Sequence, residues 1–205
     1  VIAGNPVAAE LKIDITKAVV EPIPVAVTNF VGTDTKPSQY GTDIARVIKA
    51  DLERSGLFKT IDPRAFIQKG QDIRGVPRFG DWRVINAQAL GHGRAHKVVD
   101  GRLRVEFRLW DVLAEQQMKA FALTAVPNAW RRVAHMIADA IYKRMTGEEG
   151  YFDTRIVYVA EHGPQNARVK RLAIMDQDGA NHLFLTKGRQ LVLTPRFSPT
   201  LQEIT

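Results

Sequence analysis

Residues 154–205 read TRIVYVAEHGPQNARVKRLAIMDQDGANHLFLTKGRQLVLTPRFSPTLQEIT, and this stretch decides the fold. Short apolar runs alternate with Gly, Pro and Asp breaks at regular spacing, which is typical of an all-β array. The breaks are Gly163-Pro164, Asp178-Gly179 and Lys187-Gly188. We therefore expect four short strands, at residues 155–160, 169–175, 182–185 and 191–193.

Four short strands make one blade of a β-propeller, and blades repeat every ~40 to 50 residues. The stretch holds about one such period. A single blade does not bury both faces of its sheet, because repeat units gain their core from their neighbours. The pattern therefore predicts the first blade and the start of a second, cut just inside a propeller, with a separate N-terminal domain before it.

Bulk composition sets further limits. The chain has 205 residues, of which 45% are hydrophobic and 25% charged, as in an ordinary globular protein. No run reaches the roughly 18 to 20 apolar residues that span a bilayer. The absence of cysteine excludes disulfides, cysteine-ligated zinc and a thiol nucleophile. The net charge of +7 favours anionic partners, but the basic residues form no block, so we interpret them as a solvated surface.

The segment Leu11–Thr16 alternates apolar and polar residues and is predicted to be a half-buried strand. As the first element it has a free end and can detach from its sheet. Pro22 and Pro24 stiffen the connection that follows. Val7-Ala8-Ala9 has the small residues of a signal-peptidase site, so residues 1–9 are read either as a signal-peptide remnant or as a tail.

The rest of the N-terminal domain, residues 10–147, is expected to be an α+β domain with a mixed sheet and two main helices. Residues 148–153 are the expected linker to the blade. A single helical turn is expected at residues 81–84. The strands are expected at residues 25–30, 57–62, 86–90, 103–110 and 116–124.

Two amphipathic helices follow from apolar residues at i, i+3, i+4 and i+7 spacing. The first spans residues 40–55, with Ile44 and Leu52 on its apolar face and Asp51 away from it. The second begins at an Asn128 N-cap and ends at Thr146. Its apolar stripe is Trp130, Val133, Ala134, Ile137, Ala138, Ile141, Tyr142 and Met145.

Three motifs invite a chemical reading, and each has a plainer one. Gly91-His92-Gly93-Arg94-Ala95-His96 lacks the third glycine of a dinucleotide fingerprint and does not open a helix. His92 and His96 would lie ~13 Å apart on a strand, so they are read as exposed or hydrogen-bonded histidines rather than metal ligands. Asp176-Gln177-Asp178-Gly179 has its glycine too early for a calcium loop and is read as a hairpin turn. No catalytic residue, metal site or cofactor is predicted.

A nucleic-acid surface needs basic residues interleaved with aromatic platforms. Arg104, Arg108 and Trp110 on one strand face, with Lys119, come nearest to this pattern. The plainer interpretation, which we prefer, is a sheet face covered by a helix edge, on which the arginine stems pack and their heads reach water.

Several short motifs resemble the TolB family, the periplasmic propeller proteins of the Tol–Pal system in Gram-negative bacteria. Residues 176–181 match the family's D-x-D-G-x-N turn, and Phe197-Ser198-Pro199 matches the start of its aromatic-S-P-D-G element, from which Thr200 and Leu201 depart. Ser55-Gly56-Leu57-Phe58 resembles the family's N-terminal domain. Residues 143–147, KRMTG, resemble its domain junction. The resemblance runs from about Leu11 to Pro199.

The resemblance implies a non-catalytic periplasmic adaptor that supports outer-membrane integrity and constriction at cell division. It implies a monomer that binds TolA through its N-terminal strand and Pal through its propeller. Other outer-membrane lipoproteins, porins and imported colicins are further partners that it suggests, without membrane insertion or nucleic-acid binding. Carried over to this sequence, the TolA-binding strand comprises Glu10, Leu11, Lys12, Ile13, Asp14, Ile15 and Thr16.

Two other functions remain open from the residues. The propeller start also suits a periplasmic peptidase whose catalytic domain lies elsewhere, and a G-x-S-x-G elbow further along the chain would favour it. A basic nucleic-acid-binding module would show binding that falls steeply with salt.

Overall fold

The computed structural model describes residues 21–33, 38–73, 75–188, 192–198 and 203–204. The predicted strand at Leu11–Thr16 and the segment 1–9 lie outside these residues. The chain divides into two compact units, Val1–Gly150 and Tyr151–Thr205. No helix in the described ranges combines the length and apolar character needed to cross a membrane.

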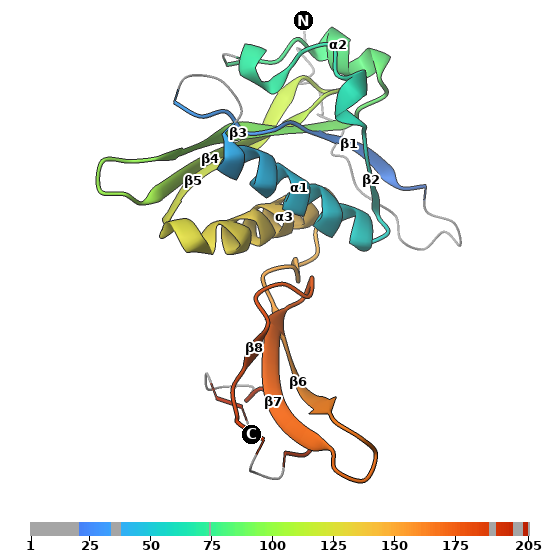
Figure 1. Ribbon diagram of the computed structural model, residues 1–205. Helices are drawn as coiled ribbons and strands as arrows, with labels where there is room; N and C mark the ends of the chain where they lie inside the picture. The colour runs from blue at the N-terminus through green and yellow to red at the C-terminus, as the bar shows by residue number, and fades with distance from the viewer. Residues whose placement is uncertain (1–20, 34–37, 74, 189–191, 199–202, 205) are drawn as a thin grey trace, which may run out of the picture. The chain divides into compact units, whose positions relative to one another are not determined.

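The first unit is built on a five-stranded mixed sheet in the order β2-β1-β3-β4-β5 (Figure 1). Strand β1 pairs in parallel with β2 and β3, and β3, β4 and β5 form an antiparallel meander. The parallel pairs place β1 inside the sheet, where Val25, Ala26 and Val27 are fully buried. The strands are β1 (Ile23–Val27), β2 (Phe58–Thr60), β3 (Ala89–Lys97), β4 (Leu103–Asp111) and β5 (Gln116–Ala125).

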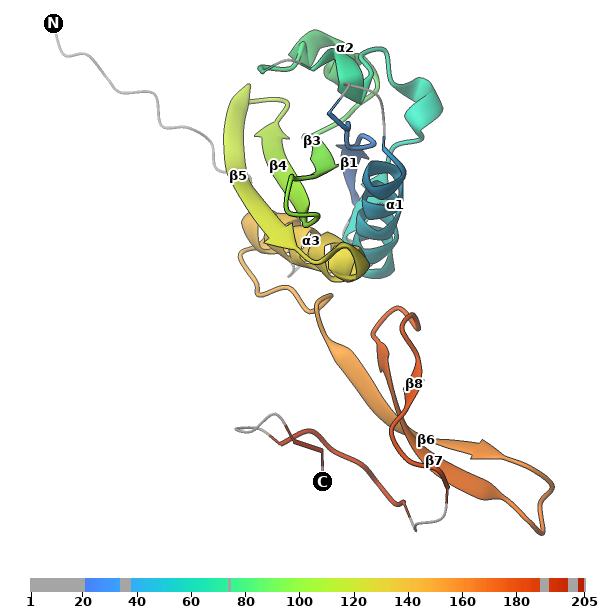
Figure 2. The same ribbon diagram turned by 60° about the vertical axis from the view of Figure 1, so that its left-hand side comes forward.

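Helices α1 (Gln39–Arg54) and α3 (Trp130–Thr146) lie side by side on one face of the sheet (Figures 1 and 2). Their apolar faces meet the inward side chains of β4, Leu103, Val105, Phe107 and Leu109, all at most 1% exposed. Ser38 caps α1 by accepting a hydrogen bond from the Gly41 amide at 3.0 Å. Gly147, with φ of 83°, ends α3 in the left-handed conformation that glycine adopts without strain.

A second, smaller core covers part of the opposite face. It is formed by the short helix α2 (Phe79–Val84) with two 3-10 turns, η1 (Pro63–Ala65) and η2 (Gly70–Asp72), in the preceding segment. Trp82 and Trp110 pack edge-on against Phe66 and Phe79, at ring distances of 5.1 and 5.8 Å. The buried cluster comprises Ala26, Phe66, Phe79, Trp82, Ala87, Leu90, Trp110 and Val112. Figure 2 shows α2 and α3 on opposite sides of the sheet.

Several predicted boundaries in this unit are wrong. The strand expected at 25–30 runs from Ile23 to Val27. Pro24 fits inside it although it has no backbone N–H, and its carbonyl accepts a hydrogen bond from the Gln88 amide at 2.9 Å. The strand expected at 86–90 is β3, from Ala89 to Lys97. Asn86 has a φ of 60° and closes the turn that ends α2. Helix α2 has six residues where one turn at 81–84 was expected.

The predicted N-cap at Asn128 is also wrong. Residues Pro127–Ala129 form a 3-10 turn, η3, and Ala129 precedes the first residue of α3. Helical structure begins before the predicted cap, at this turn. Pro127 occupies the first position of the turn, and the Ala129 amide donates a hydrogen bond to the Val126 carbonyl. The exposed Asn128 therefore lies inside a helical segment instead of capping it.

The second unit is a three-stranded antiparallel sheet in the order β6-β7-β8, with β6 (Arg155–His162), β7 (Val169–Asp176) and β8 (Leu183–Phe184). The β7–β8 turn has the predicted hairpin form, with the Gly179 amide donating to the Asp176 carbonyl at 2.9 Å. The predicted fourth strand is not formed at Val192 and Leu193, and Leu191 lies outside the described residues. Within the described part of this unit, only Phe152 and Ala173 are buried, as expected for one sheet of a propeller.

Candidate functional site

The predicted partner-binding residues Glu10–Thr16 lie outside the described residues, so the structure gives no geometry for them. The described chain begins with Glu21 and Pro22, both exposed, and enters the sheet at Ile23, which is 7% exposed. The amide of Ile23 donates to the Leu57 carbonyl at 2.9 Å. Ile23 is thus the first residue of the described sheet.

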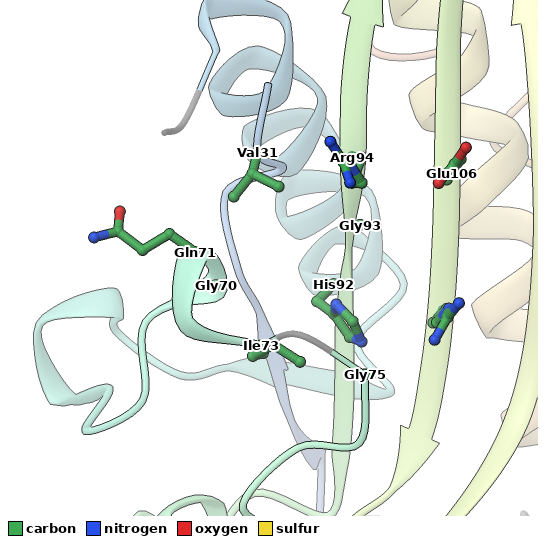
Figure 3. A pocket seen from close by; sticks show the side chains of 10 residues that line it. Val31, Gly70, Gln71, Ile73, Gly75, His92, Gly93, Arg94 and Glu106 are labelled. Carbon is green, nitrogen blue, oxygen red and sulfur yellow. The ribbon is translucent and has the colours of Figure 1, made fainter. Parts of the chain in front are cut away.

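A cavity of about 390 Å³ opens on the sheet face opposite α1 and α3 (Figure 3). One wall is formed by β3 and β4, where His92 and Arg94 lie across from Arg108 and Glu106 in the antiparallel register. The other wall comes from the chain that follows β1 and from the segment around η2, and it includes Val31, Gly70 and Ile73.

Close packing positions the second wall. A methyl group on Gly70 would lie 2.7 Å from Thr28 Oγ1 and 2.9 Å from the Asn29 carbonyl oxygen. Only glycine therefore lets η2 approach the chain that leaves β1. This approach brings the segment around η2 over the β3–β4 face and gives the cavity its depth.

His92 is the buried polar group of the cavity, with 8% of its surface exposed. Its Nε2 accepts a hydrogen bond from the indole nitrogen of Trp110 at 2.9 Å, and the two rings stack with centroids 6.4 Å apart. Burial lowers the pKa of His92 to about 4, and the nearby Arg108 guanidinium lowers it further in the same direction. The ring is therefore neutral at pH 7, and because Nε2 is an acceptor, its proton is on Nδ1.

The charged groups of the cavity are not balanced. Glu106 accepts from Arg104 Nε at 3.0 Å and is thereby already paired. Arg94 and Arg108 are exposed, and neither side chain makes a hydrogen bond or ion pair with any described residue. Two guanidinium groups thus line one cavity beside a neutral imidazole donor, which favours an anionic ligand there.

The glycine-rich motif at residues 91–96 has a packing role. Gly91 and Gly93 face the α1–α3 side of β3, where the Phe30 and Phe107 rings stack at 6.2 Å. A Cβ on Gly93 would lie 2.0 Å from the Glu106 carbonyl oxygen and 3.2 Å from the Phe30 ring. The motif lies on strand β3, beyond the predicted strand end at Leu90, and does not open a helix, as its missing third glycine indicated. Its histidines differ: His92 is buried and hydrogen-bonded, and His96 is half-buried.

The structure corrects the candidate nucleic-acid face. Trp110 is 6% exposed, between Phe79 and His92, and so has no free ring face on which a base can stack. Arg104 and Arg108 lie on the same strand face, as predicted, but Arg104 is engaged by Glu106. The preferred interpretation, a face partly covered by a helix, is confirmed for the end of β4 that carries Trp110.

A buried polar pair between the helices was missed. His135 Nδ1 lies 2.6 Å from Asp51 Oδ2, with the side chains 2% and 0% exposed, and Arg54 contacts the other carboxylate oxygen at 2.8 Å. The prediction that Asp51 points away from the apolar face is therefore wrong. Asp51 precedes the predicted core residue Leu52, and His135 follows the predicted core residue Ala134. These positions beside the apolar faces were the sequence signal that could have indicated the buried pair. The pair joins α1 to α3 and lies too deep to meet a substrate.

The fold thus defines a class of protein in which an α+β domain precedes a propeller-type β-sheet. Residues 11–118 match the family model of the TolB amino-terminal domain, and residues 142–205 match that of the TolB beta propeller domain. The chain belongs to the TolB family.

Two relatives place the chain more closely. It is 58% identical, over all 205 of its residues, to the Tol-Pal system protein TolB of Paramagnetospirillum magneticum, of which it covers 46%. It superposes on the crystal structure of TolB from Acinetobacter baumannii with a TM-score of 0.67 at 24% identity, covering 89% of this chain and 43% of that one. The chain therefore spans about half the length of the relatives that it matches.

Proposed function

We propose that this chain is part of a non-catalytic periplasmic adaptor of the Tol–Pal system. It binds TolA through Glu10–Thr16 and Pal through its propeller, and it supports outer-membrane integrity and constriction at division. The observation that carries this proposal is the 58% identity, along the whole chain, to a relative named as a Tol-Pal system protein. The proposed layout is a tail or signal-peptide remnant at 1–9, the α+β domain at 10–147, a linker at 148–153 and the propeller from 154.

The pairing of β1 is compatible with a detachable N-terminal segment. β1 is paired in parallel with β2 on one edge and with β3 on the other. Release of Glu10–Thr16 would therefore leave these hydrogen bonds of β1 in place. A segment that acts as a partner-binding arm must leave without unfolding its domain.

Strand addition supplies the binding mechanism. An extended segment with a free end can join the edge of a partner's sheet, where its backbone hydrogen bonds provide affinity and alternate side chains fill pockets. Leu11, Ile13 and Ile15 share one side of such a strand, and Lys12 and Asp14 share the other. In this arrangement the apolar side enters TolA and the charged side sets electrostatic complementarity.

Calorimetric titration of the full-length protein with the C-terminal domain of TolA tests the proposal. The matched variant lacks Val1–Thr16, and its circular dichroism spectrum is compared with that of the full-length protein before the titration. We expect the binding heat to disappear on deletion. Equal affinity in both proteins would place the TolA site elsewhere, and no binding by either would remove TolA as a partner.

A further inference from the structure

The cavity on the β3–β4 face has the features of a ligand site that the proposed adaptor function does not use. Its volume of about 390 Å³ falls in the range of roughly 300 to 1,000 Å³ typical of small-molecule sites. The described residues that line it all belong to the first unit.

The donor set of the cavity is specific. His92 is 92% buried, its Nε2 is occupied by the Trp110 indole, and its Nδ1–H has no acceptor among the described residues. Nδ1 of His92 is not among the fully buried unpartnered atoms of the described residues, so its N–H is open to the cavity and available to a water or ligand acceptor. Figure 3 shows His92 and Arg94 projecting from β3 on the side of the cavity.

The two arginines that line the cavity favour a negatively charged ligand. Arg108 lies directly opposite His92 in the β3–β4 register, and Arg94 is two residues further along the same face of β3. Glu106, the acidic residue among those that line the cavity, is paired with Arg104 and leaves both guanidinium groups to solvent. Planar guanidinium groups bind carboxylates with two parallel hydrogen bonds, and a neutral imidazole N–H adds a third donor.

The side chains of the opposite wall favour a ligand that also has a hydrocarbon portion. Val31 and Ile73 line the side that faces the strands together with Gln71 (Figure 3), and Gly70 and Gly75 contribute no side chain. A bare inorganic ion would leave this apolar wall and most of the cavity unused. A short organic anion places its charged end at the arginines and its carbon chain along Val31 and Ile73.

We propose that this cavity binds a small organic carboxylate, held by Arg94, Arg108 and the Nδ1–H of His92. The role is proposed in addition to TolA binding, since the residues that carry it are on β3 and β4 and not in Glu10–Thr16. The site would make the N-terminal domain responsive to a small anionic solute or to a carboxylate side chain of a docked peptide.

The test is a titration of the full-length protein with succinate at constant ionic strength, followed by the amide and indole resonances of Trp110 and the amide of His92. Inorganic phosphate and uncharged succinamide are titrated in parallel. We expect saturable shifts with succinate, weaker ones with phosphate and none with succinamide. An absence of succinate shifts would overturn the proposal, and equal shifts with phosphate would overturn its organic part.

Matched variants locate the site. Arg94→Gln and Arg108→Gln each remove one exposed, unpaired guanidinium and are expected to weaken succinate binding by roughly tenfold. Arg102→Gln is the control, since Arg102 pairs with Asp100 at the β3–β4 turn outside the cavity. Equal affinity in all three variants would contradict the assignment. TolA titration of the Arg94→Gln variant separates the two proposals, because its TolA affinity should not change.

Discussion

At the residue scale, His92 shows how one buried contact fixes a protonation state. The hydrogen bond from Trp110 requires an unprotonated Nε2, and burial beside Arg108 lowers the pKa of the ring to about 4. The unfolded chain has the ordinary value near 6.5. At a pH between these two pKa values, the His92 ring is protonated in the unfolded state and neutral in the folded state.

The stability of the first unit should therefore fall as the pH is lowered. His92 contributes its full stabilisation above pH 6.5 and loses roughly 3 kcal/mol of it as the pH falls from 6.5 to about 4. Urea unfolding followed by tryptophan fluorescence measures this, because all three tryptophans, Trp82, Trp110 and Trp130, are in this unit. In His92→Gln, which keeps an acceptor for Trp110, the fall over this window should be smaller by that amount; an unchanged fall would refute the assignment.

The Asp51–His135 pair makes a second prediction at this scale. His135→Ala removes one hydrogen bond from a fully buried carboxylate, which Arg54 then holds with one fewer partner. We expect a loss of about 1.5 to 3 kcal/mol in the free energy of unfolding, the range for hydrogen bonds to charged groups. Met136→Ala, at the neighbouring exposed position, is the control and should change it little. Equal effects would mean that the pair does not stabilise the α1–α3 contact.

At the element scale, strand β3 requires glycine more strictly at position 93 than at position 91. A Cβ on Gly93 would lie 2.0 Å from a backbone oxygen of β4, which cannot move without breaking the sheet pairing. A Cβ on Gly91 would meet the Phe107 ring at 3.2 Å, and a ring can shift by a few tenths of an ångström.

Gly93→Ala should accordingly destabilise the protein by about 3 kcal/mol or more, and Gly91→Ala by clearly less, in the range of overpacked core sites. The midpoints of urea unfolding of the two variants give the comparison. A Gly91→Ala variant as unstable as Gly93→Ala would show that ring packing, and not the β3–β4 backbone approach, sets the requirement.

Elements with strong periodicity were predictable from the sequence, and their ends were not. The alternation of Leu103, Val105, Phe107 and Leu109 and the stripe of α3 placed both elements correctly. Strand β3 was cut short because Gly91, Gly93 and the polar residues between them do not look like a strand. Its pairing with β4 over nine residues is decided by tertiary contacts that no local pattern records.

The cavity was out of reach for the same reason. His92 and Arg94 share a face with Arg108 only once β3 is known to extend to Lys97 and to pair with β4. The opposite wall depends on η2, inside a stretch that shows no periodicity. Asp51 was misplaced because a carboxylate beside an apolar stripe normally faces water, and its buried partner His135 is 84 residues away.

At the scale of the whole molecule, the two units differ in how they are stabilised. The first buries two cores on opposite faces of one sheet. In the described part of the second, apolar side chains such as Leu183, 58% exposed, and Phe184, 46% exposed, remain at the surface. A propeller sheet gains its core from neighbouring blades, whereas the first unit buries its cores within itself.

The most direct measurement of the adaptor account is calorimetric titration of the TolA C-terminal domain with two full-length variants of the N-terminal segment. One carries serine at Leu11, Ile13 and Ile15; the other carries serine at Lys12 and Asp14. Strand addition predicts that the first variant loses binding by at least about a hundredfold, as burial of three apolar side chains requires, and that the second keeps most of its affinity with an altered salt dependence. Equal losses in both variants, or none in either, would contradict binding through an extended strand.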